Sequence, residues 1–445
     1  MTYDVVVVGA GVMGASIALE FQRAGRAVMV VDKGDAVGGA STSASSSVVR
    51  FNYSTRDGVV AAWESAHMWM DWEDHLRGGT SDGSRLDAKS VGPHLAEFHS
   101  IGMLIILSSD YDLRPALGHF DELGLPYESL GATQLTERFP TVDFGRYHPP
   151  RLASDPSFFD DANGQVSAVY TPGAGFIDDP QLSAVNMMDA AVAHGATLQL
   201  RRQVVAINSV GSTNRQVTGV RLADGTEIEA SVVVNAAGPW SSQLNKLADV
   251  LDDMAVSTRA LRQTVAASQA PDDFGVGNGG VMFGDLDLGT YSRPHSGGSY
   301  LVGGIEADCD PLLWTDDPDS ATGNPDPEMF ETLMYRAARR VPSLSIPHRP
   351  MGVAGDYDVT DDWVPIYDRT NLDGYYLAIG TSGNQFKNAP LVGKIILALD
   401  EAAKNGHDHD QEPVVLHCER TGLDLGLGQF SRNRAPAATG GNVMG

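Results

Sequence analysis

Three glycines and one aspartate near the start of the chain have the spacing of a dinucleotide-binding site. Gly9, Gly11 and Gly14 form a Gly-x-Gly-x-x-Gly pattern, and Asp32 follows eighteen residues after the last of them. Gly9 permits a tight turn, Gly11 lets backbone N–H groups approach a pyrophosphate, and Gly14 lets a helix pack closely on a strand. The carboxylate of Asp32 can accept hydrogen bonds from ribose hydroxyls. The pattern predicts a bound dinucleotide, either NAD or FAD, because the two share this cradle.

Two basic residues further along the chain stand out by their sequence surroundings. Arg50 follows a serine-rich turn in the pattern Arg-x-x-Tyr, and Lys387, one of only six lysines, stands just past Gly383 in a glycine-rich loop with apolar flanks. A guanidinium offers a fork of N–H donors and an ammonium a compact charge, so each side chain suits an anionic group. The alternatives are an ion pair at a helix end or between domains for Arg50, and a cofactor or backbone contact for Lys387.

The elements around the glycine motif form a β-α-β unit. Tyr3–Val8 is a β-branched run typical of a buried parallel strand, and Ala15–Arg23 predicts a helix closed by Gly25. Ala27–Val31 predicts the second strand, which places Asp32 at its end. The pyrophosphate would then lie at the N-terminus of the helix, where backbone N–H groups and the helix dipole favour an anion.

Later segments predict further strands of the same sheet. Ser231–Asn235 is a buried run that ends in Ala237 and Gly238, and Tyr375–Ile379 turns through Gly380–Gly383 towards a helix that Pro390 opens. These glycine-rich strand ends favour FAD over NAD, because they can line the remainder of a longer cofactor. We also expect a single strand over Thr197–Ile207.

The composition excludes several classes of protein. The 445 residues, 42% of them hydrophobic, allow two or three globular domains, and the net charge of −26 disfavours nucleic acid and anionic lipid as partners. Cys309 and Cys418 lie far apart without metal-type spacing, so we expect no metal site. The apolar runs are too short to span a membrane, and no basic segment typical of a signal peptide precedes the first strand, so we expect a cytoplasmic protein.

Several short motifs follow one another along the chain, and together they cover essentially residues 3–400. Besides the glycine motif they are Gly38–Ser45 leading to Arg50 and Tyr53, Gly173–Asp178 with Pro180, Asn235–Trp240, Tyr291–Pro294 with Leu301–Gly304, Thr360–Trp363 and Ser382–Lys387. In these motifs the chain resembles the D-amino-acid oxidase superfamily of flavoproteins, and most closely its sarcosine oxidase and glycine oxidase branch.

The resemblance implies an α/β fold in which a Rossmann-like FAD-binding domain is interleaved with a sheet-rich α+β substrate domain. We expect residues 1–85, 150–250 and 345–434 in the FAD-binding domain, residues 86–149 and 251–344 in the substrate-binding domain, and residues 435–445 as a flexible tail. FAD should bind noncovalently, because Ala44 and Ala354–Asp356 occupy the places where relatives attach flavin to His or Cys. The expected FAD-binding residues are Gly9, Gly11, Val12, Met13, Gly14, Asp32, Lys33, Ser41, Thr42, Ser45, Val204, Ala237, Gly238, Trp240, Gly380, Gly383, Asn384, Gln385, Phe386 and Lys387.

The resemblance also implies the reaction. Arg50 and Lys387 would hold the carboxylate of a small, N-substituted, sarcosine-like amino acid, and Tyr357 would line the pocket with its hydroxyl, although a core tyrosine is an equal alternative. Hydride transfer from the substrate to flavin would give an imine, which water hydrolyses.

Three alternatives remain open at this stage. Oxidases of the branch use a lysine of the substrate sheet for reaction with oxygen, but this chain has no lysine between Lys246 and Lys387, and Arg262 is the nearest candidate cation. The electron acceptor is therefore either O2 or another, unidentified compound. The substrate could instead be a 2-hydroxy acid, or the chain could be a flavin-bearing subunit or assembly factor that needs a partner.

Overall fold

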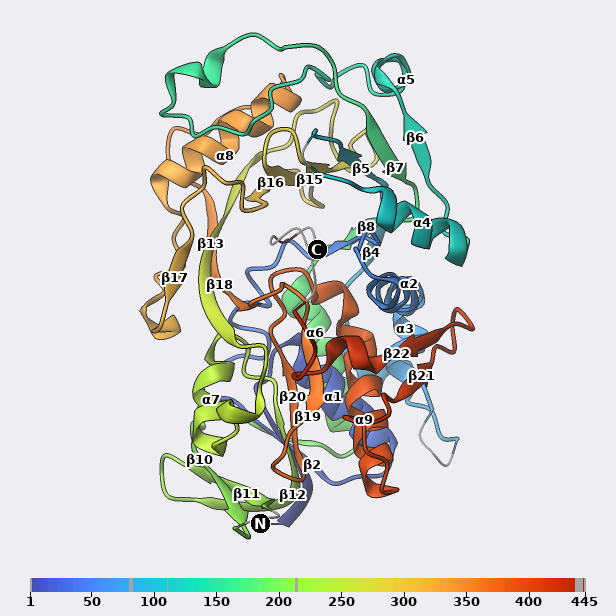
Figure 1. The fold of residues 1–445 in the computed structure, drawn as a ribbon, viewed down its shortest axis with the longest axis vertical. Coiled ribbons are helices and arrows are strands. Elements are labelled where there is room, and N and C mark those ends of the chain that lie inside the picture. The colour runs from blue at the N-terminus through green and yellow to red at the C-terminus, as the bar shows by residue number, and fades with distance from the viewer. Residues whose placement is uncertain (1, 80–82, 110, 213–214, 437–442, 444–445) are drawn as a thin grey trace.

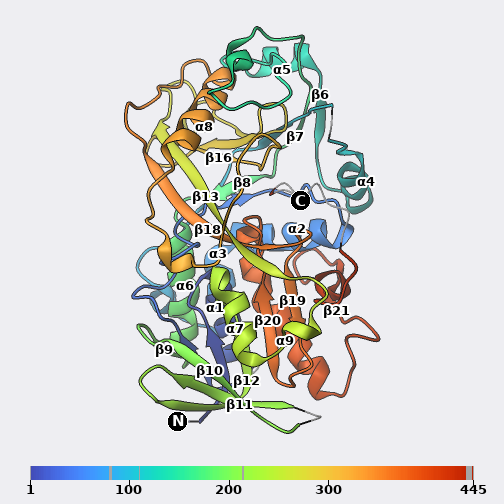
Figure 2. The same cartoon turned by 60° about the vertical axis from the view of Figure 1, so that its left-hand side comes forward.

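The computed structural model describes residues 2–79, 83–109, 111–212, 215–436 and 443. Two large sheets dominate it, one in the lower and one in the upper half of Figure 1, and Figure 2 shows the same two halves from another side. The lower sheet takes strands from residues 2–31, 197–235 and 366–379, and the upper sheet takes its strands from the segments between them, within residues 103–360. This interleaving confirms the predicted α/β architecture.

The lower sheet has eight strands around a parallel centre. β1 (Thr2–Val8) lies between β2 (Val28–Val31) and β12 (Glu227–Asn235), with Val5 opposite both Val28 and Val232. Val5–Val8 are buried on both faces of the sheet, as a run of consecutive valines requires, because helices cover a parallel sheet on each side. The other strands are β9 (Thr197–Gln199), β10 (Val204–Val210), β11 (Gln216–Leu222), β19 (Ile366–Arg369) and β20 (Tyr375–Ile379).

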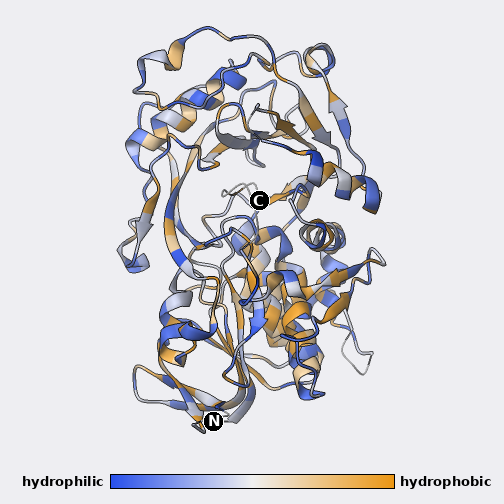
Figure 3. Cartoon of the chain, in the orientation of Figure 1, coloured by the Kyte–Doolittle hydropathy of each residue, from blue (hydrophilic) through white to orange (hydrophobic). Residues whose placement is uncertain are grey.

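Helix α1 (Val12–Arg23) packs against this sheet and between two further helices, α6 (Pro180–Ala193) and α9 (Ala389–Lys404). The approach of α9 is close, because a Cβ at Gly393 would lie 2.3 Å from the carbonyl oxygen of Ser16. Buried apolar residues on β1 and on all three helices form one continuous core. Figure 3 shows this concentration of hydrophobic residues in the lower half.

The upper sheet has nine strands and carries α8 (Pro327–Arg340) on one side. Its longest strand, β13 (Thr258–Gln269), pairs antiparallel with β18 (Gly352–Thr360) along nearly its whole length. The remaining strands are β5 (Met103–Ile106), β6 (Glu128–Leu130), β7 (Ala168–Thr171), β14 (Met282–Asp285), β15 (Thr290–Pro294), β16 (Ser299–Gly304) and β17 (Leu313–Thr315).

Two small sheets and five further helices complete the described fold. A three-stranded sheet contains β3 (Val48–Val49), β8 (Gly175–Ile177) and β4 (Phe98–Ser100), and β21 (Val415–His417) forms a hairpin with β22 (Asp424–Gly426). The remaining helices are α2 (Arg56–Met70), α3 (Trp72–Arg77), α4 (Arg114–Leu123), α5 (Ala132–Arg138) and α7 (Ser241–Ala248). No helix in the described ranges is long and apolar enough to cross a membrane.

The structure differs from the sequence expectations in three places. β7 and β18 pair within the upper sheet, although their segments were assigned to the FAD-binding domain, because their hydrogen-bonding partners are β5 and β13. The single strand expected over Thr197–Ile207 is two strands, since Arg201 adopts a left-handed φ of 58° between them. Most of the expected flexible tail lies outside the described residues, but Val443 is described and is buried.

Candidate active site

A cavity of about 950 Å³ runs from the glycine motif of β1 and α1 to the loop that follows β20. It is lined by the serine-rich turn after Gly39, by the segment between β12 and α7, and by β18 of the upper sheet. All the residues that the sequence analysis proposed for cofactor or substrate line this cavity, with the exceptions of Gly14 and Gly380. The fold thus brings together residues that are more than 370 positions apart in the chain.

The N-terminus of α1 opens onto the cavity. Gly9 has a left-handed φ of 113° and turns the chain from β1 into the helix, whose N-cap residue Gly11 has no side chain to cap it. The N–H of Val12 donates to Thr42 Oγ1 at 3.1 Å, and the first turn contains no acidic residue. These features leave the positive end of the helix dipole directed at the cavity, which fits a pyrophosphate.

The two glycines outside the lining have packing roles. A Cβ at Gly14 would lie only 1.9 Å from the carbonyl oxygen of Gly9, so this glycine sets the distance between α1 and the turn. The N–H of Gly380 donates to Asp358 Oδ2 at 2.6 Å, and a Cβ there would lie 2.3 Å from Thr360 Cγ2. Both glycines shape the backbone that lines the cavity.

Asp32 stands at the end of β2, as predicted. Its carboxylate accepts hydrogen bonds from the N–H groups of Ala10 and Gly34, each at 2.6 Å. Lys33 Nζ pairs with Asp319 at 2.5 Å and lies 4.0 Å from the ring centroid of Trp240. The indole N–H of Trp240 is buried without a hydrogen-bond partner among the described residues. This donor, the helix N-terminus and Asp32 together fit the phosphates and ribose of a dinucleotide.

The far end of the cavity holds the two predicted cations. Arg50 follows β3 and Lys387 lies in the single turn before α9, and both are almost completely buried. The ring of Tyr53 lies 5.0 Å from the Arg50 guanidinium and 5.1 Å from Lys387 Nζ. Lys387 Nζ donates to the hydroxyl of Tyr53 at 2.7 Å and to the carbonyl of Asn384.

No carboxylate of the described residues pairs with either cation. The guanidinium of Arg50 donates to the carbonyl oxygens of Asn52 and Val443, at 2.7 and 2.5 Å. The alternative reading of Arg50 as a structural ion pair is therefore not supported. Two buried basic side chains without a counterion fit an anion, because burying a charge without a partner is costly.

Burial, and then the charge of Arg50, lower the pKa of Lys387 well below its usual value. A bound carboxylate would favour the ammonium form, so binding at higher pH must take up a proton. We expect the dissociation constant of a simple carboxylate such as propionate to rise with pH as the ammonium of Lys387 loses its proton. In Lys387→Met this rise should be smaller, with an affinity near that of the wild type at high pH. Titration of flavin absorbance at several pH values tests this, and an equal slope in both proteins would contradict it.

Tyr357 lies on β18 and is hydrogen-bonded to Tyr291 of β15. Burial raises the pKa of both hydroxyls, and Tyr291 also shares a hydrogen bond of 2.7 Å with Ser46 Oγ. The ring of Tyr357 packs on Gly383, where a Cβ would come within 2.3 Å of it. Both tyrosines therefore line the cavity in their neutral, hydrogen-bonding form.

Sequence reasoning missed Asp358, a buried carboxyl that lines the cavity. Burial raises its pKa to about 7, and it anchors the N–H of Gly380. Nothing in the sequence distinguishes it from its neighbours, since only the pairing of β18 with β13 turns it inward. The structure also corrects the place considered for Arg262, which forms a two-point ion pair with Asp356 at 2.9 and 3.1 Å and does not line the cavity.

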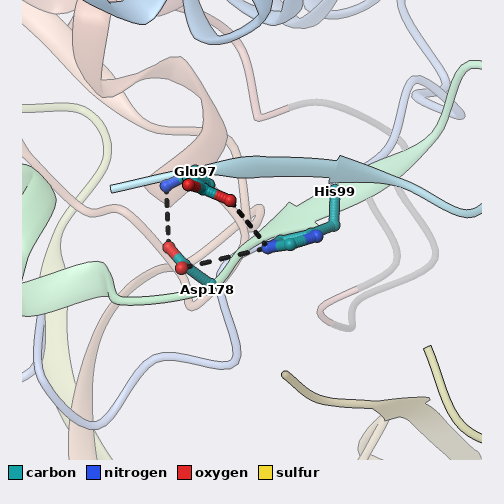
Figure 4. A group of neighbouring side chains, drawn as sticks. All are labelled: Glu97, His99 and Asp178. Carbon is teal, nitrogen blue, oxygen red and sulfur yellow. Dashed lines mark hydrogen bonds and ion pairs between the residues drawn. The ribbon is translucent and has the colours of Figure 1, made fainter. Parts of the chain in front are cut away.

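A cluster of Glu97, His99 and Asp178 lies at the three-stranded sheet, away from the cavity lining (Figure 4). His99 Nε2 lies 3.9 Å from a carboxylate oxygen of each acidic residue. Asp178 accepts the N–H of Glu97 at 2.8 Å. These contacts join β4 to the end of β8.

Comparison with known proteins shows the family to which the chain belongs. A family model described as FAD dependent oxidoreductase (DAO) matches residues 4–399. FAD-dependent oxidoreductase domain-containing protein 1 of Xenopus laevis is 24% identical, with 89% of this chain and 78% of that protein covered. Glycine oxidase of Geobacillus kaustophilus (strain HTA426) is 23% identical, with 95% and 99% covered.

Solved structures share the fold. The crystal structure of glycine oxidase from Geobacillus kaustophilus has a TM-score of 0.70 at 20% identity, with 98% of this chain and 99% of that chain covered. L-proline dehydrogenase from P. horikoshii has a TM-score of 0.71 at 21% identity, with 92% and 94% covered. Since the family model spans most of the sequence, the protein belongs to the DAO family of FAD-dependent oxidoreductases.

Proposed function

We propose that the protein oxidises the C–N bond of a small α-amino acid, with an N-substituted, sarcosine-like compound as the expected substrate. The observation that carries this proposal is the pair Arg50 and Lys387, two buried cations around Tyr53 at one end of the FAD cavity. Two similar proteins, a glycine oxidase and an L-proline dehydrogenase, support an amino acid as substrate.

The protein's own groups bind and orient the substrate. Arg50 and Lys387 hold the carboxylate, which fixes the α-carbon relative to the cavity and removes the entropy cost of orientation from the chemical step. The hydroxyls of Tyr357 and Tyr291 offer hydrogen bonds on the side of the upper sheet. FAD, when bound, supplies the acceptor for the hydride of the α-carbon. Water then hydrolyses the released imine.

We propose noncovalent binding for FAD. Neither a cysteine nor a histidine occurs among the described residues that line the cavity. A Cβ added at Gly355 would lie 2.8 Å from the Cβ of Ala44, so the two places considered for covalent attachment are neighbours in the structure. Neither alanine nor glycine can form a bond to flavin. Denaturation with acid should therefore release all the flavin into the supernatant.

An anaerobic titration tests the proposed reaction. Purified protein is mixed with primary, N-methyl and cyclic amino acids and, separately, with 2-hydroxy acids, while the absorbance of oxidised flavin is followed. We expect bleaching by an N-substituted amino acid, and readmission of air then separates an oxidase from a dehydrogenase that uses another acceptor. Bleaching by a 2-hydroxy acid alone would contradict the proposal. Absence of bleaching by every carboxylate would contradict it too and would favour a protein that works only with a partner subunit.

A further inference from the structure

A backbone segment of the chain itself occupies the carboxylate end of the cavity. Val443 is buried and lines the cavity, and its carbonyl oxygen accepts the hydrogen bond from Arg50 Nη2. The N–H of the same residue donates to Glu306 Oε2 at 2.8 Å. Arg50 therefore binds the carbonyl oxygen of Val443, and Glu306 binds the N–H of the same residue.

The geometry of this contact matches an α-amino acid. In a chain residue the nitrogen and the carbonyl carbon are attached to one Cα, and in a free α-amino acid the amine and the carboxyl carbon are attached in the same way. A ligand that places its carboxylate on Arg50 would thus bring its nitrogen to Glu306. We propose that Glu306 is the residue that receives the amino group of the substrate, and this inference rests on the proposed amino-acid oxidation.

The surroundings of Glu306 fit this role. Glu306 lies two residues after the end of β16, and its backbone has a left-handed φ of 54°. Its second carboxylate oxygen, Oε1, accepts a hydrogen bond from Gln263 Nε2 at 3.0 Å. Within the described residues it has no Lys, Arg or His as an ion-pair partner. The nearby hydroxyls of Tyr291 and Tyr357 interact with its charge. A substrate ammonium would supply the missing positive charge.

The same carboxylate can prepare the amine for oxidation. When the ammonium gives its proton to Glu306, one N–H bond breaks, one O–H bond forms, and the lone pair stays on nitrogen, where loss of hydride from the α-carbon requires it. Burial raises the pKa of Glu306 to about 8, which makes this carboxylate a stronger base than an ordinary glutamate and brings its pKa nearer to that of an amine. A substrate that binds to both residues takes the place of the Val443 backbone.

Glu306→Gln tests the proposal, because glutamine keeps the shape and an acceptor for hydrogen bonds but carries no charge. We expect kcat/KM for the amino acid found by anaerobic titration to fall by about a hundredfold, a typical effect of removing a general base. The dissociation constant of propionate, a carboxylate without an amine, should not increase, since Arg50 and Lys387 remain and a nearby carboxylate is lost. Glu306→Asp keeps a carboxylate and should retain more activity than Glu306→Gln.

Glu331→Gln on the exposed face of α8 is the matched control and should leave both values unchanged. Equal losses for propionate and for the amino acid in Glu306→Gln, or no loss for either, would overturn the role of Glu306. Wild-type flavin that no amino acid reduces would instead overturn the proposed function. Flavin content, measured for every variant, shows whether each one folds and binds FAD.

Discussion

Arg50→Ala should lower kcat/KM for the amino acid by at least about a hundredfold while FAD stays bound. A charge-assisted hydrogen bond contributes about 1.5–3 kcal/mol, and loss of one partner of a buried charge pair costs about 2–5 kcal/mol. Both ranges describe the one interaction that the alanine variant loses when the carboxylate binds beside Lys387 alone. Most of the effect should be in KM, because the carboxylate is bound in the ground state as well as in the transition state. Steady-state kinetics together with the ratio of bound FAD to protein measure it.

Two further variants complete this test, one at Arg50 that keeps the charge and one control at an exposed arginine. Arg50→Lys keeps a positive charge but not the fork of the guanidinium, so its kcat/KM should lie between those of the wild type and Arg50→Ala. Arg114→Ala removes an exposed arginine at the start of α4 that pairs only with Asp112, and it should have no effect. Loss of FAD from Arg50→Ala would show that the residue holds the fold or the cofactor rather than the substrate.

The local part of the site follows from sequence because its signals are local. Gly9, Gly11, Gly14 and Asp32 lie within one β-α-β unit, where strand, turn and helix have separate patterns and each position has one physical task. The structure places Asp32 at the end of β2 with its carboxylate on two backbone N–H groups, as its position after a buried strand predicts.

Contacts between distant segments follow from sequence only in part. Arg50 and Lys387 meet across Tyr53 although 337 positions separate Lys387 from Arg50, and only the family resemblance predicted the meeting. Glu306 and Asp358 were not found, because they acquire their environment from strand pairing in the upper sheet. A carboxylate in a mixed stretch of sequence carries no sign of whether it will be buried.

The pairing of β18 within the upper sheet was not expected, for a related reason. β18 lies in a stretch of sequence that leads back to the lower sheet, so its composition resembles that of its neighbours along the chain. Its antiparallel register with β13, from Thr258 opposite Thr360 to Ala266 opposite Gly352, assigns it to the upper sheet. The same register places Tyr357 and Asp358 in the cavity wall. The pairing of β18 with β13 therefore determines both the sheet to which β18 belongs and this part of the site.

Gly14→Ala should give a protein that is less stable and binds little or no FAD. In most helices the change from Gly to Ala stabilises by about 0.5–1 kcal/mol, because alanine loses less backbone entropy on folding. At Gly14 the added Cβ would lie 1.9 Å from the carbonyl oxygen and 3.0 Å from the carbonyl carbon of Gly9, both backbone atoms that cannot rotate away. Helix α1 would have to move from the turn, and the N–H groups that face the cavity would move with it.

The matched control for this prediction is Gly118→Ala on α4, where an added Cβ would meet no atom within 4 Å. It should raise the Tm slightly and leave the FAD content unchanged. The same substitution should therefore raise the Tm in α4 and lower it in α1. Thermal unfolding and flavin absorbance of the two purified variants measure both effects. A Gly14→Ala protein with wild-type FAD content and Tm would show that α1 can shift without loss of the cradle, and would remove the close contact at Gly9 from the account of how this fold binds its cofactor.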